Sequence, residues 1–536
     1  MVHILIENNR IHSWSTHSQE KMIGYVKGHA FYQKELLQGE LLFQTVQKAW
    51  NEMYLEQLLF DLNGQFCIIL QQEKQTILIT DKIRSYPLFY LVTGDDYIVT
   101  DTGDTAYTSL SDREWDKTAV LSYLSAGYMN AGSTLFSNCK ITPASTYIVI
   151  DKEIAIKYYY TPISLKQLTQ PDIIFKRSKQ ALESAFCRML ESIGNATIIL
   201  PLSGGYDSRL LACLCKQFNV PNVICYTYGI KGSPEINVSQ MVAQQLGYPW
   251  YYVEYTKEKW ERLLKSNIFE EYMRYAGNLN TIPHLQDFLA IQELKEKQII
   301  PEKAVVIPGH SGDLIGGSHL PQHIQRKNLA SSLYDKYFTL NILKPREKKD
   351  LINNLQLYIE KTYPTGSEQD YYQAFHLWGI QFRQINFIIN SVRLYEFQGL
   401  DWRVPLWDDA FEQVWDAIPY KLRVGSTLYN KFLFDTYFMP LGVSFHKKKE
   451  NNIPSPFIQF IRNIISNEDR YYIKRLLSQV HLYSFPKDIN ALDIVGELLM
   501  KEKNLQKLPC IRTTKPNSMC MKALYYLSLY PESFPQ

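Results

Sequence analysis

Short apolar runs separated by polar turns dominate the first part of the chain. The runs at residues 66–70, 76–80, 88–92 and 97–100 are joined by polar segments of hairpin length. Apolar runs of this size, bounded by turn residues, predict β-hairpins. Two further runs flank the polar residues 151–153 and predict one more hairpin, after which residues 158–162 resemble a linker. We therefore predict a β-rich amino-terminal part.

The rhythm changes at about Pro171. A helical pattern extends to Ile193 and is followed by apolar runs that alternate with helical stretches, at residues 196–200, 223–228, 251–255 and 304–307. This alternation predicts a parallel sheet with helices on both faces. Ligands of such sheets bind beyond the carboxyl ends of the strands. After Pro321 the pattern is mostly helical.

The composition is typical of a globular protein with several domains. The chain has 536 residues, of which 46% are hydrophobic and 21% charged, and its net charge of +3 is too small to favour nucleic acid as a partner. Its eight cysteines are scattered without a CxxC pair, so we expect neither a zinc site nor a disulfide framework. No apolar run approaches the length of about 18 residues that a membrane span needs, and we expect a cytoplasmic protein without membrane insertion.

The most informative segment follows the first strand of the predicted parallel sheet. The run Ile198–Leu202 ends in Ser203-Gly204-Gly205-Tyr206-Asp207-Ser208, and an apolar run then begins a helix. Adjacent glycines allow a tight turn, and the first amides of a helix suit a pyrophosphate. The two serines add hydroxyl donors, and Asp207 could hold Mg²⁺ against the phosphates. The alternative is a glycine-rich strand–helix turn without a ligand, but the order of strand, loop and helix favours a nucleotide site.

Residues 203–208 resemble the pyrophosphate-loop signature of the asparagine synthetase superfamily, which includes β-lactam synthetases and lasso-peptide cyclases. The resemblance implies adenylation of a carboxylate by ATP, release of pyrophosphate, and amide formation when an amine attacks. It implies two domains. Residues 1–165 would form an α+β domain of the Ntn-hydrolase-like glutaminase type in a degenerate state. Residues 166–536 would form an α/β adenine-nucleotide α-hydrolase-like (pyrophosphate-loop) synthetase domain with a helical carboxyl-terminal part.

Two further loops extend the resemblance. Residues 226–235 resemble the adenine-side loop of asparagine synthetases, where Tyr228 would contact adenine. Residues 308–317 resemble the second loop of the family, in which Asp313 would share Mg²⁺ with Asp207. The resemblance therefore implies ATP and Mg²⁺ as cofactors. The implied nucleotide-binding residues are Leu202, Ser203, Gly204, Gly205, Asp207, Ser208, Tyr228 and Gly309.

The second loop departs from the family at His310, where asparagine synthetases carry glutamate and β-lactam synthetases carry tyrosine. A neutral imidazole there could remove a proton from the attacking amine. The segment 399–408 places Asp401 where a glutamate completes the dyad of β-lactam synthetases, so it would orient His310. Two alternatives remain: His310 is a loop histidine bonded to backbone, and Asp401 belongs to a structural ion network with Arg403 and Asp408.

Residues 445–450 resemble a lysine loop of the family that contacts the phosphates during adenylation. Lys449 is the predicted cation, with Lys447 as second choice, and a solvated charged face is the alternative. Residues 274–284 precede the second loop and could line the acceptor pocket. Their asparagine and histidine side chains fit helix caps and core contacts equally well.

The resemblance also implies a glutaminase cysteine directly after the initiator methionine, but Val2 occupies that position. A thiol can use its own α-amine as the base only at a mature amino terminus, so we expect no glutaminase activity. The alternative is a cryptic thiol such as Cys67.

Three substrate hypotheses follow from the resemblance. The first is amidation of aspartate or a sugar acid with free ammonia, the second joins an amino compound to a carboxylate, and the third is an intramolecular closure of the lasso-peptide or β-lactam type. The partners would be a small-molecule or peptide carboxylate and an amine, with a separate source of ammonia or of a precursor peptide. A rival from another class is an inactive homologue that binds a nucleotide or a partner. The presence of Asp207, Asp313 and a candidate lysine argues against it.

Overall fold

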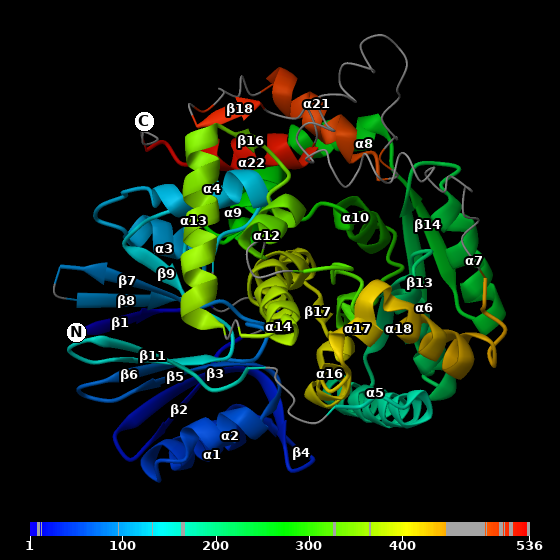
Figure 1. Ribbon diagram of the computed structural model, residues 1–536, viewed down its shortest axis with the longest axis horizontal. Helices are drawn as coiled ribbons and strands as arrows, with labels where there is room; N and C mark the ends of the chain where they lie inside the picture. Colours follow the sequence, from blue (N-terminus) through cyan, green and yellow to red (C-terminus); the bar gives the residue numbers. More distant parts are fainter. Residues whose placement is uncertain are drawn as a thin grey trace.

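The computed structural model shows a β-rich amino-terminal part beside a larger α/β part (Figure 1). It describes residues 1–7, 11, 13–94, 96–130, 132–161, 167–324, 329–363, 366–445, 488, 490–502, 508, 510–513 and 518–532. Within these residues, no helix is both long enough and apolar enough to cross a membrane.

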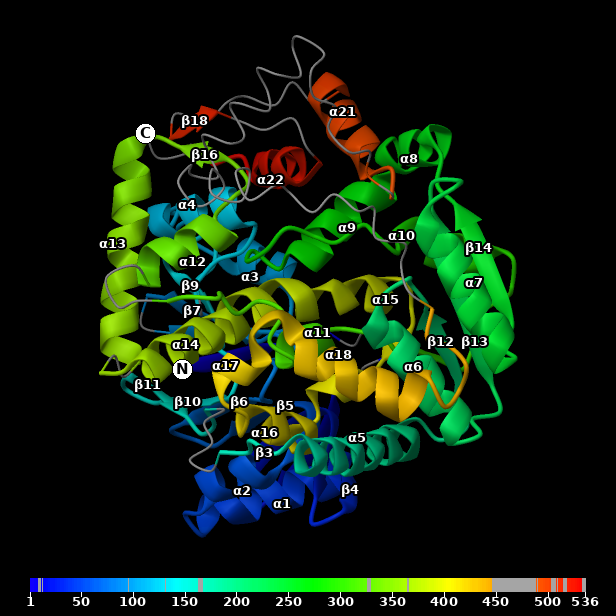
Figure 2. The ribbon, with the colours of Figure 1, turned by 45° about the vertical axis from the view of Figure 1, so that its right-hand side comes forward.

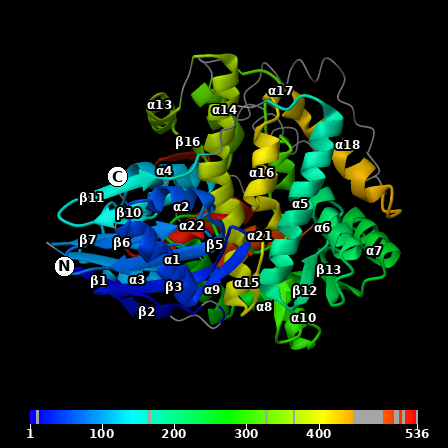
Figure 3. The same cartoon turned by 90° about the horizontal axis from the view of Figure 1, so that it is seen from below.

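Two sheets are stacked in the amino-terminal part, with two helices on the outer face of the larger one (Figures 1 and 3). The larger sheet has the order β11-β10-β6-β5-β3-β2, with β4 also paired to β3, and the smaller one has the order β1-β8-β7-β9. The elements are β1 (Val2–Leu5), β2 (Ser15–Gln19), β3 (Met22–Tyr32), β4 (Glu35–Gln38), α1 (Gly39–Asn51), α2 (Leu55–Asp61), β5 (Asn63–Gln71), β6 (Thr76–Thr80), β7 (Phe89–Thr93), β8 (Asp96–Thr100), α3 (Gly103–Ser109), α4 (Lys117–Ala126), β9 (Cys139–Ile141), β10 (Thr146–Ile150) and β11 (Ile154–Tyr158).

Strand β5 shows why this part folds in layers. Its residues Phe66, Ile68 and Leu70 face the core under α1 and α2, whereas Cys67 and Ile69 face the core between the two sheets. Side chains of a strand point alternately to its two faces, so a strand covered on both sides is apolar throughout. The hairpins predicted from the apolar runs are confirmed as β5–β6, β7–β8 and β10–β11.

The α/β part is built on a sheet of five parallel strands in the order β14-β13-β12-β15-β17. From the central strand β12 the chain first adds β13 and β14 on one side and then returns to add β15 and β17 on the other. The order of the strands therefore reverses between β12 and β15, and open α/β sheets bind ligands at such a switch point. The first elements are α5 (Pro171–Ile193), β12 (Thr197–Pro201), α6 (Tyr206–Gln217), β13 (Val223–Gly229), α7 (Pro234–Leu246), β14 (Trp250–Glu254), α8 (Lys257–Leu264), α9 (Asn267–Gly277), α10 (Phe288–Glu296), β15 (Ala304–Val306) and α11 (Gly312–Ile315).

Each face of this sheet contributes to a different core. Ile198 and Leu200 pack with residues of α5, α6, α7, α16 and α18, whereas Ile199 and Val306 belong to a core that continues into the amino-terminal sheets. Figure 2 shows α6 and α7 in front of the parallel strands. Because the described residues of both parts share this core, the amino-terminal sheets and the parallel sheet pack against each other.

The remaining elements are mostly helical, as the sequence predicts. They are α12 (Leu329–Tyr337), β16 (Ile342–Leu343), α13 (Pro345–Thr362), α14 (Glu368–Trp378), η2 (Gly379–Ile388), η3 (Ile389–Val392), α15 (Arg393–Phe397), β17 (Asp401–Trp402), η4 (Pro405–Trp407), α16 (Asp409–Asp416), α17 (Tyr420–Arg423), η5 (Val424–Ser426), α18 (Thr427–Leu433), η6 (Phe434–Phe438), α21 (Leu492–Glu502), β18 (Ile511–Thr513) and α22 (Ser518–Ser528). Between α14 and α15 the chain stays helical but passes through a π-helix, η2, and a 3₁₀ turn, η3. Such irregular turns are common at functional sites.

The expected linker at residues 158–162 needs a correction. Tyr158 is the last residue of β11, and the next two tyrosines, Tyr159 and Tyr160, are buried. The Tyr159 hydroxyl donates to the Thr80 carbonyl at 2.7 Å, and the Tyr160 hydroxyl donates to Glu412 at 3.0 Å. The start of this segment is therefore packed against both parts of the chain.

Candidate active site

The glycine-rich loop connects β12 to α6, and its own serines fix its shape. The Ser203 amide donates to the Ser208 hydroxyl oxygen at 3.1 Å, and the Gly205 amide donates to the Ser203 hydroxyl oxygen at 3.1 Å. Gly205 is the residue before the first turn of α6 and brings no side chain to it. The first amides of a helix have no partner within it and carry the positive end of its dipole. The loop therefore has the shape that the sequence predicts for an anion-binding turn, and the binding of an anion there stays a prediction.

The second loop, between β15 and α11, packs directly against this turn. A Cβ atom on Gly309 would lie 2.5 Å from the Ser208 amide nitrogen, and one on Gly312 would lie 2.7 Å from Oδ1 of Asp207. Only glycine allows so close an approach. The Asp313 amide donates to Oδ2 of Asp207 at 2.8 Å. The two loops predicted to share a ligand thus meet at the switch point of the sheet.

Two aspartates, Asp207 and Asp313, lie close to each other where the loops meet. Burial, followed by the nearby Asp313, raises the pKa of Asp207 to about 7, although the Asp313 amide and the Tyr429 hydroxyl at 3.0 Å stabilise its charged form. Asp313 is exposed and accepts a bond from the Ser318 hydroxyl at 2.8 Å. Hard oxygen ligands of this kind suit Mg²⁺, and a divalent cation would remove the repulsion between the two groups. The residues present therefore fit a magnesium ion.

His310 belongs to the second loop and lies against the irregular helical segment formed by η2 and η3. Its Nε2 atom is 3.4 Å from the Ser391 hydroxyl oxygen, and that hydroxyl donates to the Ile388 carbonyl at 2.6 Å. The serine oxygen can therefore only accept from the ring, which assigns the proton to Nε2. Nδ1 is buried without a hydrogen-bond partner, and burial lowers the pKa of His310 to about 4. A neutral imidazole with an unpaired Nδ1 is the state that a general base requires.

The structure does not place Asp401 behind His310. Oδ1 of Asp401 accepts from the Trp402 amide at 2.7 Å and from Arg403 at 2.6 Å, and Arg403 also donates to the Ser192 hydroxyl at 2.9 Å. No hydrogen bond joins Asp401 to His310 within the described residues. The expected orienting contact of Asp401 is therefore corrected: the aspartate pairs with Arg403, whereas Asp408, the third member of the alternative ion network, pairs with Arg188.

Of the other predicted nucleotide residues, Leu202 supports the first loop, whereas the contact of Tyr228 with adenine stays a prediction. The Leu202 amide donates to the Tyr226 carbonyl at 2.8 Å, and the Leu202 carbonyl accepts from Thr227 at 2.5 Å, so this backbone serves to hold the loop on β13. The Tyr228 ring stacks on Tyr255 at a centroid distance of 5.1 Å. Lys447 and Lys449 lie outside the described residues.

Several residues of the site carry no local sequence signal. Tyr429 reaches Asp207 from α18, and Ser391 and Gln384 reach the second loop from the irregular helix, where the Ser311 hydroxyl donates to Gln384 at 2.7 Å. Arg209, fully buried in α6, donates to the carbonyls of Val443 at 3.0 Å and Phe445 at 2.7 Å. The position of Arg209 directly after the loop signature could have indicated that it is buried. The sequence gives no sign of the two carbonyl groups that it binds.

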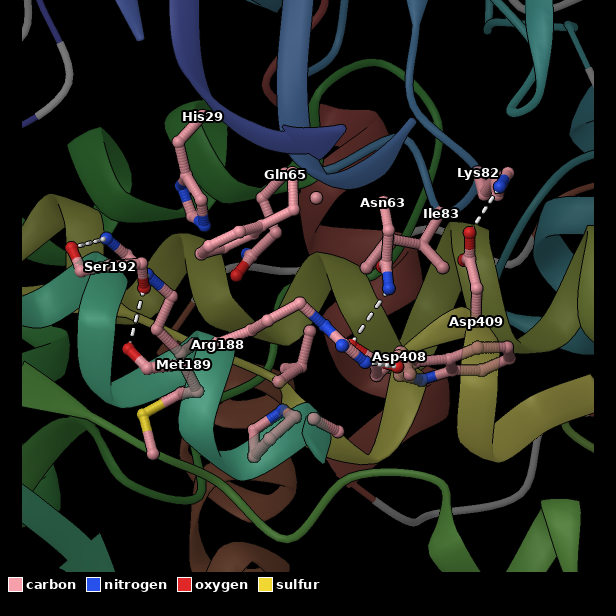
Figure 4. Close-up of a pocket in the computed structure, with 17 residues that line it drawn as sticks. His29, Asn63, Gln65, Lys82, Ile83, Arg188, Met189, Ser192, Asp408 and Asp409 are labelled. Atoms are coloured by element: carbon pink, nitrogen blue, oxygen red, sulfur yellow. Dashed lines mark hydrogen bonds and ion pairs between the residues drawn. The ribbon is translucent and has the colours of Figure 1, made fainter. Parts of the chain in front are cut away.

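A pocket between the two parts of the chain collects paired charges (Figure 4). Arg188 of α5 binds Asp408 through two bonds, of 2.9 and 2.5 Å, and Asn63 of β5 donates to the same carboxylate at 2.9 Å. Lys82 pairs with Asp409 at the other end of the pocket. Since these charges satisfy one another, the pocket fastens the amino-terminal sheets to α5 and α16 and lies apart from the two loops.

Replacing Asp408 by alanine should lower the free energy of unfolding by about 2–4 kcal/mol, because Arg188 would keep a half-buried charge without its partner. The first turn of α16 would also lose its cap, since Asp408 accepts from the Ala410 amide at 3.0 Å. Urea unfolding measures the change. The matched control is Lys421→Ala, whose exposed ion pair with Glu368 should contribute less than about 1 kcal/mol. Equal stability of Asp408→Ala and the parent chain would contradict the assignment.

The parallel sheet, the glycine-rich turn after its central strand and the adjacent aspartates define an α/β domain whose loops meet at the switch point of the sheet. Residues 179–433 match the family model described as asparagine synthase. Residues 179–433 therefore form a domain of the asparagine synthase family, as the loop signatures in this segment indicate.

The solved structures that are similar to this chain have low sequence identity to it. The glutamine phosphoribosylpyrophosphate amidotransferase of B. subtilis is 10% identical, over 55% of this chain and 62% of its own, with a TM-score of 0.19. The NH3-dependent NAD synthetase of Campylobacter jejuni is 15% identical, over 37% and 80%, with a TM-score of 0.18. The NMN synthetase of Francisella tularensis is 14% identical, over 40% and 93%, with a TM-score of 0.19. The chain thus spans less than two thirds of the amidotransferase, and no curated protein sequence matches it significantly.

Proposed function

We propose that the protein is an ATP-dependent carbon–nitrogen ligase that activates a substrate carboxylate as its adenylate and forms an amide with an amine. This proposal rests on the contact between Asp207 and Asp313. The two residues belong to glycine-rich loops that meet at the switch point of the sheet. The family match of residues 179–433 supports it. A ligase of this kind would release AMP and pyrophosphate.

The chemistry assigns a task to each part of the site. A carboxylate oxygen of the acid attacks the α-phosphorus of ATP, and pyrophosphate leaves with the electrons of the broken α–β bond. The turn at Ser203–Ser208 would bind that leaving group through its amides. Mg²⁺ held by Asp207 and Asp313 would supply charge neutralisation at the phosphates. Lys449, outside the described residues, remains our proposed cation for the adenylation transition state.

His310 would serve the second half of the reaction. The amine attacks the acyl carbon, its proton moves to Nδ1 of His310, and AMP leaves with the acyl–oxygen bond electrons. Nδ1 suits this task because it is unpaired and the ring is neutral at physiological pH. The bond between Ser391 and Nε2 would keep the ring in place.

We propose that the amine does not come from glutamine within this chain, and that residues 1–165 are a degenerate glutaminase-type domain. Cys67 is fully buried, and burial raises its pKa well above its usual value. A thiol in this state is a poor nucleophile. The scattered cysteines also suit a reducing cytoplasm.

Added glutamine should therefore yield no glutamate above background when the chain turns over with ATP and a pool of acids. Ammonium chloride in place of glutamine should support amide formation if free ammonia is the acceptor. An enzyme-coupled assay for glutamate measures the first result. Steady release of glutamate that Cys67→Ala abolishes would contradict the proposed loss of glutaminase activity.

The proposed function can be tested by measuring the exchange of labelled pyrophosphate into ATP. Each carboxylic acid of a panel is added in turn, and the exchange that depends on the acid is measured. Aspartate, sugar acids, amino acids and acidic peptides represent the intermolecular and intramolecular substrate hypotheses. Exchange with at least one acid is the expected result. Tight nucleotide binding without exchange for any acid would favour the inactive homologue.

A further inference from the structure

Arg209, the residue directly after the loop signature, is a buried cation beside the glycine-rich turn. Its side chain is 0% exposed, and no carboxylate of the described residues pairs with it. Its guanidinium instead donates to three main-chain carbonyls, those of Val443 at 3.0 Å, Phe445 at 2.7 Å and Gly204 at 3.4 Å. Arg209 therefore joins the turn to a segment that begins 234 residues further along the chain.

The cost of burying Arg209 indicates that packing alone does not account for it. Burial lowers the pKa of Arg209, and its Nε atom is buried without a hydrogen-bond partner. The ring centroids of Tyr206 and Phe438 lie 5.4 and 5.2 Å from its guanidinium carbon. Neutral carbonyls and aromatic faces compensate a buried cation only in part. An apolar side chain of similar length would avoid this cost, so we looked for a task that requires the guanidinium.

The bond to Gly204 fixes the orientation of one peptide group of the turn. The Gly204 carbonyl and the Gly205 amide belong to the same planar trans peptide, so they point in opposite directions. While Arg209 holds the carbonyl, the amide faces the Ser203 hydroxyl oxygen, to which it donates at 3.1 Å. A peptide between two glycines rotates more readily than one between larger residues, because neither glycine has a Cβ. Rotation would turn a carbonyl oxygen to the side where the amide now lies, and that oxygen would repel a phosphate.

The segment that Arg209 holds also contacts the turn through its first helix. The Tyr429 hydroxyl of α18 donates to Asp207 at 3.0 Å, and the Tyr206 ring packs on Phe438 of η6 at a centroid distance of 5.9 Å. Figure 2 shows α18 beside α6. Residues 427–445, which we call the α18 segment, therefore contact three residues in the first turn of α6.

We propose that Arg209 is a positioning residue for ATP, which holds the Gly204–Gly205 peptide with its amide towards the phosphates and joins the turn to the α18 segment. Nucleotide binding would then stabilise this segment. The inference rests on the proposed function for the presence of ATP at the turn. It assigns Arg209 no contact with the nucleotide, because the guanidinium is buried and bonded to main-chain carbonyls.

Inorganic pyrophosphate with Mg²⁺ is the probe for the turn, and adenosine is the probe for the remainder of the nucleotide site. Arg209→Met should weaken pyrophosphate binding by about tenfold or more in titration calorimetry, whereas the affinity for adenosine should stay unchanged. Arg209→Lys should not restore pyrophosphate binding, because an ammonium group keeps the charge but lacks the planar fork that spans the carbonyls. Adenosine binding also reports that each variant is folded.

The matched control is Arg84→Met, at another buried arginine. Arg84 donates to the Thr142 carbonyl at 3.5 Å and to Asn386 at 2.7 Å, so this variant also loses buried hydrogen bonds of a guanidinium. It should bind pyrophosphate and adenosine as the parent chain does, even where its thermal midpoint falls.

Hydrogen–deuterium exchange tests the link to the α18 segment and needs no variant. In the parent chain, ATP with Mg²⁺ should slow deuterium uptake in peptides that cover residues 434–445 by about threefold or more. In Arg209→Met and Arg209→Lys, saturating ATP should leave the uptake of these peptides unchanged. Helix α13, which packs against α4 and α12, is the internal control.

The contrary results differ from one another. Equal pyrophosphate affinity in Arg209→Met and the parent chain, or recovery in Arg209→Lys, would overturn the positioning role. A parallel loss of pyrophosphate and adenosine binding would leave Arg209 with a structural role only. Unchanged deuterium uptake of residues 434–445 in the parent chain would exclude the link to the α18 segment. If all the expected results are found but no carboxylic acid supports exchange of pyrophosphate into ATP, the proposed function fails and the positioning of the nucleotide by Arg209 stands.

Discussion

Replacing Asp207 by asparagine should abolish acid-dependent exchange of pyrophosphate into ATP, with a loss of about 10³-fold or more. Asparagine keeps the shape and can accept the Asp313 amide through its oxygen, but it brings no charge to a cation at the two loops. The affinity for ATP should fall only when Mg²⁺ is present, because the lost group acts on the metal. Exchange kinetics and nucleotide titrations with and without Mg²⁺ measure both effects.

The same substitution should not destabilise the protein. The folded-state pKa of Asp207, about 7, lies above its ordinary value of 3.8, so the folded chain binds more protons than the unfolded chain between these values. Its contribution to stability is present below about pH 4 and is lost as the pH rises to about 7. A neutral asparagine removes this loss, and the thermal midpoint at pH 8 should be equal or higher. Asp350→Asn, at an exposed position of α13, is the matched control. Full exchange activity in Asp207→Asn would contradict the metal site.

Replacing His310 by alanine should separate the two half-reactions. Pyrophosphate exchange should persist, because adenylation takes place at the turn and the aspartates, whereas amide formation should fall by about 10²–10⁴-fold. The reason is that the substitution removes Nδ1 of His310, the proposed acceptor of the amine proton. Rapid-quench measurement of amide product, together with exchange on the same enzyme preparation, gives the comparison.

Two further variants sharpen the test of His310. His323→Ala, at an exposed histidine, should leave both half-reactions unchanged. Ser391→Ala should reduce amide formation less than His310→Ala, because it removes only the contact at Nε2. Normal amide formation by His310→Ala would exclude the ring as the base.

The sequence predicts the parallel sheet well, because its strands are continuous apolar runs. It misses β3 (Met22–Tyr32), in which Lys27, Gly28 and His29 interrupt the apolar pattern. In the structure Lys27 is buried and paired with Asp101 at 3.1 Å, a contact 74 residues away along the chain. A polar residue inside a strand is tolerated when it has such a partner, and pattern alone cannot show the partner.

The same limit applies to the candidate site. Loop signatures identify Asp207, Asp313 and His310, because each stands at a fixed place after a strand. They misjudge Asp401, whose short side chain binds Arg403 two residues away instead of reaching His310. The histidine of residues 274–284 does lie beside His310, whereas Asn280 of that segment is a core partner that donates to the Ser133 carbonyl.

Transfer of an oxygen isotope tests the central claim most directly. The parent chain is supplied with ATP, Mg²⁺, ammonium or an amine pool, and the panel of carboxylic acids, whose carboxyl groups carry ¹⁸O. Adenylation followed by amide formation predicts that AMP is released and that its phosphate carries one ¹⁸O atom from the acid, detectable by mass spectrometry. Formation of ADP with ¹⁸O in inorganic phosphate would contradict the proposed function, because the acid would then have been activated at the γ-phosphate.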